Sequence, residues 1–82
     1  MPKKFPPLTP QQVIQILTTK KFQFDRQKGS HAQYVHPISG RTVTVDMKEK
    51  EFGITLMKSM IHQSGLSREE FYGATKETTK KT

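Results

Sequence analysis

Residues 31–47 read HAQYVHPISGRTVTVDM, and the predicted fold is built around this stretch. Two runs with β-branched and aromatic residues flank the turn signal at residues 37–40, a pattern typical of a β-hairpin. If His36 faces Arg41 across the turn, paired residue numbers sum to 77, as 36 and 41 do. The apolar residues of both strands then share one face, with Ala32 opposite Val45 and Tyr34 opposite Val43. A one-residue slip would destroy this match, whereas two-residue slips remain open.

The other face of this hairpin is polar, and we expect it to face solvent. It carries His31, Gln33, Val35, Thr42, Thr44 and Asp46. In the 77 register Asp46 lies opposite His31, while a two-residue slip would place Thr44 or Lys48 there. His36 has the opposite parity, so the two imidazoles of this strand cannot meet on one sheet face.

The flanking segments predict two helices and a further strand. A capping box at Thr9 and Gln12 opens a helix that ends near residue 20. Residues 54–64 form a second helix stopped by Gly65, and its apolar residues lie on one face that we expect to be buried: Leu56, Met57, Met60 and Ile61. Residues 22–25 alternate as a short strand, residues 26–30 form a basic turn, and a second capping box at residues 67–70 opens a short helical turn. The fold class is therefore α+β with the order α-β-β-β-α: a three-stranded antiparallel sheet with two helices on one face. We expect a domain at residues 9–73, a flexible lead-in at 1–8 and a disordered basic tail at 74–82.

Composition narrows the classes of function. The chain has 82 residues, 14 basic against 7 acidic side chains, and no cysteine. The net charge of +7 favours a polyanionic partner, most often nucleic acid. Lack of cysteine excludes disulfide frameworks, zinc knuckles and thiol nucleophiles, and the three histidines are too scattered for a metal site. No apolar run approaches the roughly 20 residues of a membrane span, and no signal peptide is visible, so we expect a cytoplasmic protein.

Several motifs together resemble one family. Gly29-Ser30-His31 with Tyr34, the Gly40-Arg41 strand, and the segment from Gly65 to Phe71 are similar, in this order and spacing, to the HicA family of toxins from toxin–antitoxin pairs. The resemblance implies a fold like a double-stranded-RNA-binding domain (dsRBD-like) and metal-free cleavage of mRNA without a small-molecule cofactor. It also implies a HicB-type antitoxin partner and a functional histidine, which here is His31. Asp46 and Lys48 depart from the family pattern, which often has Pro and a second His at these positions.

Metal-free RNA cleavage needs a base, an acid and cations, because the ribose 2′-hydroxyl is itself the nucleophile. Histidine suits the proton transfers, since its unperturbed pKa is about 6.5. We expect His31 to be the catalytic acid or base and Asp46 to orient its ring. The candidate RNA-binding residues are Arg26, Lys28, Ser30 and Lys48. Two alternatives remain open: a non-catalytic RNA-binding module on the same fold, and a regulatory protein that binds an acidic partner.

Overall fold

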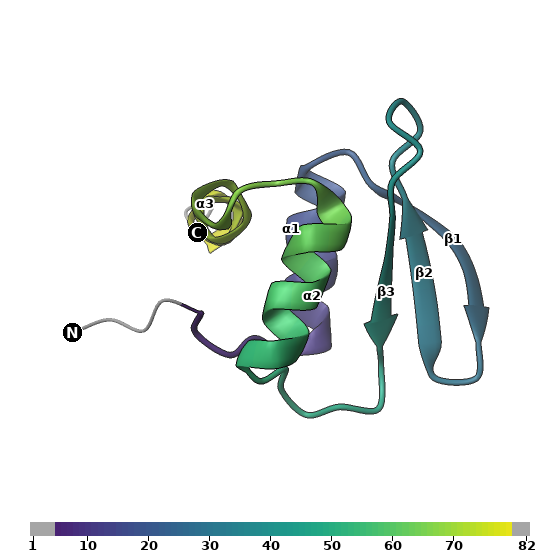
Figure 1. The fold of residues 1–82 in the computed structure, drawn as a ribbon, viewed down its shortest axis with the longest axis horizontal. Helices are drawn as coiled ribbons and strands as arrows, with labels where there is room; N and C mark the ends of the chain where they lie inside the picture. Colours follow the sequence, from purple (N-terminus) through teal and green to yellow (C-terminus); the bar gives the residue numbers. More distant parts are fainter. Residues whose placement is uncertain (1–4, 80–82) are drawn as a thin grey trace.

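The computed structural model describes residues 5–79, with side chains described for residues 5–74. The elements are α1 (Pro10–Thr19), β1 (Gln23–Lys28), β2 (His31–Val35), β3 (Thr42–Asp46), α2 (Ile54–Ser64) and α3 (Arg68–Thr79). The helices lie on one side of the antiparallel sheet, and α3 lies farthest from it (Figure 1). The predicted α+β class and the order α-β-β-β-α are confirmed, with α3 as an additional helix.

The hairpin register is the predicted one. In the sheet order β1-β2-β3, His31 pairs with Asp46, Ala32 with Val45, and Tyr34 with Val43. Ala32, Tyr34, Val43 and Val45 are all buried. The match of apolar side chains across the two strands therefore selects the register, as expected when one sheet face packs against helices.

β1 is longer than predicted and contains a β-bulge. It runs from Gln23 to Lys28, so Arg26 and Lys28 lie on a strand, and the turn is reduced to Gly29 and Ser30. Pairing shifts by one residue at Asp25: Phe24 pairs with Tyr34, but Arg26 pairs with Gln33. Such an extra residue reverses which sheet face the following side chains occupy. The prediction of a basic turn at 26–30 was wrong, because backbone pairing with β2 continues through this polar segment.

The domain extends beyond both predicted boundaries. Leu8 is buried and forms a β-bridge with Phe52, whose N–H donates to the Leu8 carbonyl over 2.9 Å. The Tyr72 hydroxyl donates to the Pro6 carbonyl, also over 2.9 Å. Residues 5–8 of the predicted flexible lead-in are therefore packed on the domain, whereas residues 1–4 lie outside the described residues.

α3 replaces the short helical turn expected at residues 67–71. Its capping box is the predicted one, with Ser67 and Glu70 exchanging backbone-to-side-chain hydrogen bonds of 2.8 and 3.0 Å. The helix continues to Thr79, and the side chains of Phe71 and Ala74 are buried in a region that contacts α1. The prediction that a solvated tail begins at Ala74 was wrong, because a small apolar residue one helical turn after Phe71 completes a buried face. Residues 80–82 of that tail lie outside the described residues.

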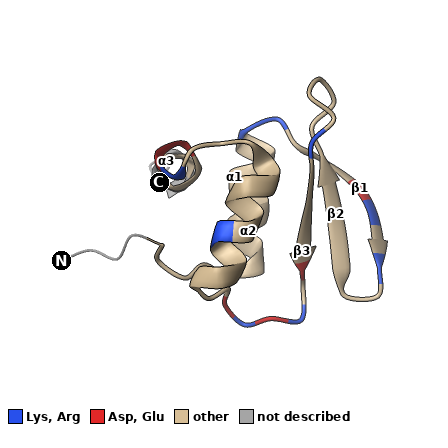
Figure 2. Ribbon diagram, in the orientation of Figure 1, with Lys and Arg blue, Asp and Glu red and all other residues tan. Residues whose placement is uncertain are grey.

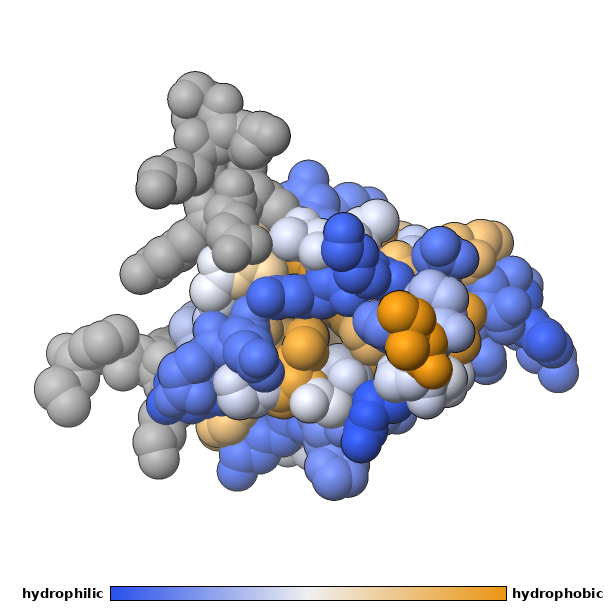
Figure 3. All heavy atoms as spheres, turned by 90° about the horizontal axis from the view of Figure 1, so that it is seen from above, coloured by the Kyte–Doolittle hydropathy of each residue, from blue (hydrophilic) through white to orange (hydrophobic). Residues whose placement is uncertain are grey.

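The surface around this core is largely hydrophilic. In the view from above, apolar groups form small separate areas among polar ones (Figure 3). The large exposed hydrophobic side chains of the described residues are Phe24, Ile38, Ile54 and Leu56. Leu56 was expected on the buried face of α2 with Met57, Met60 and Ile61, which are buried as predicted. No helix within residues 5–79 is long and apolar enough to cross a membrane.

Candidate active site

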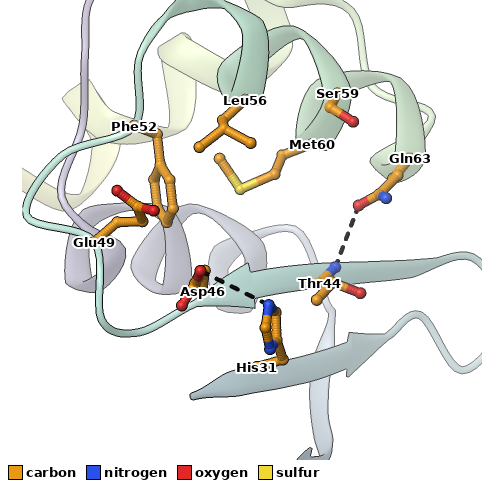
Figure 4. A pocket seen from close by; sticks show the side chains of 9 residues that line it. All are labelled: His31, Thr44, Asp46, Glu49, Phe52, Leu56, Ser59, Met60 and Gln63. Atoms are coloured by element: carbon orange, nitrogen blue, oxygen red, sulfur yellow. Dashed lines mark hydrogen bonds and ion pairs between the residues drawn. The ribbon is translucent and has the colours of Figure 1, made fainter. Parts of the chain in front are cut away.

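His31 and Asp46 face each other at one end of the sheet. His31 opens β2, Asp46 closes β3, and His31 Nε2 lies 3.7 Å from Asp46 Oδ2 (Figure 4). This distance is too long for a direct hydrogen bond, so the contact is electrostatic. The His31 side chain is 55% exposed and that of Asp46 is 20% exposed. The imidazole is therefore accessible to a large substrate, with a carboxylate on its inner side.

Asp46 is held in place by its own neighbours. The backbone N–H of Lys48 donates to Asp46 Oδ1 over 3.2 Å, and the Ser30 side chain lies close enough to the same carboxylate to lower its pKa. The Lys48 N–H is the main cause that lowers the pKa of Asp46, with Ser30, His31 and the Lys48 charge adding to it and partial desolvation opposing it. The carboxylate is therefore ionised at neutral pH. Ser30, a candidate RNA-binding residue, therefore lies next to Asp46.

The bulge at Asp25 brings the predicted cations to the His31 face of the sheet. Lys28 pairs directly with His31, which gives a row of Lys28, His31 and Asp46 across the three strands. Arg26 lies in the adjacent row beside Gln33, is exposed, and forms an ion pair with Asp25 over 3.2 Å. Figure 2 shows basic residues on β1 and the acidic end of β3 at this part of the molecule. Lys48, in the loop after β3, is also exposed, and its backbone N–H binds the Asp46 carboxylate that faces His31.

A pocket of about 240 Å³ opens beside His31. The sheet contributes His31, Thr44 and Asp46, the following loop contributes Glu49 and Phe52, and α2 contributes Leu56, Ser59, Met60 and Gln63 (Figure 4). Gln63 Oε1 accepts a hydrogen bond from the backbone N–H of Thr44 over 3.2 Å, which ties α2 to β3. The expectation of a freely solvated polar face is therefore wrong at β3, because α2 and the preceding loop flank this edge.

The residues that α2 and the loop contribute to this pocket were not predicted from the sequence to lie near His31. No motif connects residues 49–63 with His31, since their proximity depends on how α2 docks. Within the described residues, no three His, Asp or Glu side chains come together in a group that could hold a metal ion.

One comparison with known proteins decides the family. The family model described as HicA toxin of bacterial toxin–antitoxin matches residues 10–66, which include α1, the whole sheet and α2. The chain belongs to the HicA toxin family. Membership makes it the toxin component of a toxin–antitoxin pair, so an antitoxin is its expected partner. No curated protein matches the chain. The matched region contains every residue of the site described above, including His31 and Asp46.

Proposed function

We propose that this HicA-family chain is a metal-independent endoribonuclease that cleaves mRNA, with His31 as its general acid–base group. The observation that carries the proposal is the position of the imidazole. It is half-exposed at a pocket, with the Asp46 carboxylate 3.7 Å from Nε2 and Lys28 beside it in the same row. A titratable group that combines exposure, a charged neighbour and a concave surface is typical of catalytic sites.

The proposed reaction uses the 2′-hydroxyl of RNA as the nucleophile. The 2′-oxygen bonds to phosphorus, and the bond between phosphorus and the 5′-oxygen breaks. His31 accepts the 2′ proton, and the leaving 5′-oxygen takes a proton from solvent. The products carry a 2′,3′-cyclic phosphate and a 5′-hydroxyl. Asp46 faces the ring from its inner side and is the positioning residue, and the Ser30 side chain helps keep the Asp46 carboxylate ionised by lowering its pKa.

Cations around His31 would neutralise the phosphate. Lys28 is nearest in the strand pairing, because it lies directly opposite His31, and Arg26 follows one row along the same face. Lys48 is exposed two residues after Asp46, in the loop that follows β3. Negative charge increases on the phosphate oxygens as the 2′-oxygen attacks, so cations beside the scissile group lower the barrier. Their contacts to the RNA backbone also predict binding that weakens as salt concentration rises.

Cleavage of an end-labelled single-stranded RNA in EDTA tests the proposal. His31→Ala should lower the rate by about 10²–10⁴-fold, because that is the usual contribution of one acid–base group. His62→Ala is the matched control, since His62 is an exposed histidine of α2 that does not line the pocket. Its rate should equal that of the wild type, and the wild-type fragments should carry cyclic phosphate ends.

Two results would overturn the assignment: full cleavage by His31→Ala, or loss of wild-type cleavage in EDTA. If the wild-type chain binds RNA in a salt-dependent manner but never cuts it, the non-catalytic RNA-binding module takes the place of the enzyme.

We also propose that a HicB-type antitoxin covers the His31 face. Its complex with the chain should protect RNA from cleavage, and an antitoxin that binds elsewhere and leaves cleavage intact would argue against this.

A further inference from the structure

The pocket beside His31 combines an apolar floor with polar walls. Phe52 and Met60 form the floor and are almost completely buried, while Leu56 at the rim is 43% exposed. Polar side chains surround them, with Thr44 from the sheet, Glu49 from the loop and Ser59 from α2 (Figure 4). Leu56 exposes apolar surface on α2 toward this space, although Met57, Met60 and Ile61 of the same helix are buried. The pocket therefore fits a ligand with apolar faces and hydrogen-bonding edges.

The pocket volume limits the size of the ligand. At about 240 Å³ it is smaller than the roughly 300–1,000 Å³ pockets that hold whole drug-sized molecules. A single planar ring system fits this space. Nucleobases have apolar faces and polar edges, and proteins that read single-stranded RNA bind unstacked bases in this way.

The position of His31 indicates which base would enter. In ribose, the carbon that bears the 2′-hydroxyl is bonded to the carbon that bears the base. A nucleotide whose 2′-hydroxyl reaches His31 must therefore hold its own base within a few ångströms of the imidazole, where the pocket lies. We propose that the pocket binds the base on the 5′ side of the scissile phosphate, an inference that rests on the proposed function.

Glu49 gives this site a chemical preference. An ionised carboxylate only accepts hydrogen bonds. Adenine, guanine and cytosine each present an amino group on the base-pairing edge, whereas the one donor of uracil on this edge, N3–H, lies between two carbonyl oxygens whose lone pairs repel a carboxylate. The site should therefore favour the three amino-bearing bases over uracil. Gln63 contributes less to this choice, because its side-chain oxygen is already engaged by the Thr44 N–H.

Binding can be measured separately from cleavage. The His31→Ala chain, with labelled Leu and Met methyl groups, is titrated with the four ribonucleoside 3′-monophosphates and with inorganic phosphate. The methyl resonances of Leu56 and Met60 should shift at lower concentrations of the adenine, guanine and cytosine nucleotides than of the uracil nucleotide, and phosphate alone should move neither. Leu56→Ala should weaken nucleotide binding about three- to tenfold, since it removes apolar contact at the rim. Ile54→Ala is the control, because Ile54 is similarly exposed on the same helix but does not line the pocket.

Sequencing of cut sites gives the second measurement. Wild-type chain should cut rarely after uracil, and Glu49→Gln, which adds a donor, should reduce this bias while the fold is preserved. If cleavage depends on His31 but no nucleotide shifts the Leu56 or Met60 methyls, the base site is wrong and the proposed function stands. If His31→Ala cleaves RNA fully while the methyl shifts are base-selective, the enzyme assignment fails and the base site stands. Equal shifts with all four nucleotides, or with phosphate alone, would overturn the proposed preference.

Discussion

The hydrogen bond between Gln63 and Thr44 can be tested with a single substitution. Gln63 Oε1 accepts from the Thr44 backbone N–H over 3.2 Å, and this bond joins α2 to the outer edge of β3. Gln63→Met keeps the length and the helix propensity of the side chain but replaces the amide oxygen with a thioether, which is a weak acceptor. The Thr44 N–H then loses its partner on the protein.

The expected loss of stability is small and follows from the partial burial of this contact. A net hydrogen bond contributes about 0.5–1.5 kcal/mol, and the lower half of this range applies because water can reach the Thr44 N–H. For a domain of this size, 1 kcal/mol shifts Tm by about 4–8 °C, so we expect Tm to fall by about 2–8 °C. Exchange of the Thr44 amide hydrogen should become about two- to fivefold faster.

Thermal unfolding and amide hydrogen exchange measured by NMR check both numbers. Gln63→Glu is the control, because its carboxylate still accepts the Thr44 N–H and should keep this amide protected. The amides of Val43 and Val45 serve as internal references on the same strand. An unchanged exchange rate for Thr44 in Gln63→Met would refute the reasoning, and so would equal deprotection in the Glu variant.

Three further predictions test other parts of the fold. Gly65→Ala should cost about 1–3 kcal/mol in urea unfolding, because φ is +76° and the new Cβ would lie 2.5–2.8 Å from side-chain atoms of Arg41. Arg41→Ala in the same chain should recover part of that loss, and a wild-type midpoint for Gly65→Ala alone would contradict this account. Thr9→Ala removes the cap of α1 and should cost about 1 kcal/mol by the same assay. The lowered pKa of Asp46 stabilises the fold above the ordinary carboxyl pKa, and this contribution disappears as pH falls through the lowered value. Asp46→Asn should therefore flatten the acid side of a plot of unfolding midpoint against pH, and an unchanged slope would show that other carboxylates dominate it.

Much of the fold follows from local sequence patterns. The capping boxes at Thr9 and Ser67, the end of α2 at Gly65 and the 77 register of the hairpin were all predicted and are confirmed. Each depends on residues that are close in the chain or on the strict alternation of side chains in a strand. The pairing of His31 with Asp46 across the two strands was predictable for the same reason, because it follows directly from the register.

The surroundings of His31 could not be predicted in this way. In a regular strand, successive side chains alternate between the two faces of the sheet. Arg26 and Lys28 would then lie on the same face as Phe24, which is the core face beside Tyr34. The unpaired residue at Asp25 moves both cations to the opposite face, next to Gln33 and His31. A bulge depends on the competition between two strand pairings, and a single polar strand contains no pattern that marks it.

The amino-acid sequence alone determined the element order, the hairpin register and the family resemblance, because these depend on residue spacing within short segments. The packing of α2 against the edge of β3, which forms the pocket with His31, became visible only in the three-dimensional structure. The same holds for Leu8 and Ala74, which complete the core from beyond the predicted boundaries. These contacts join residues far apart in the chain, and they are selected by how whole helices and strands bury their apolar surfaces together.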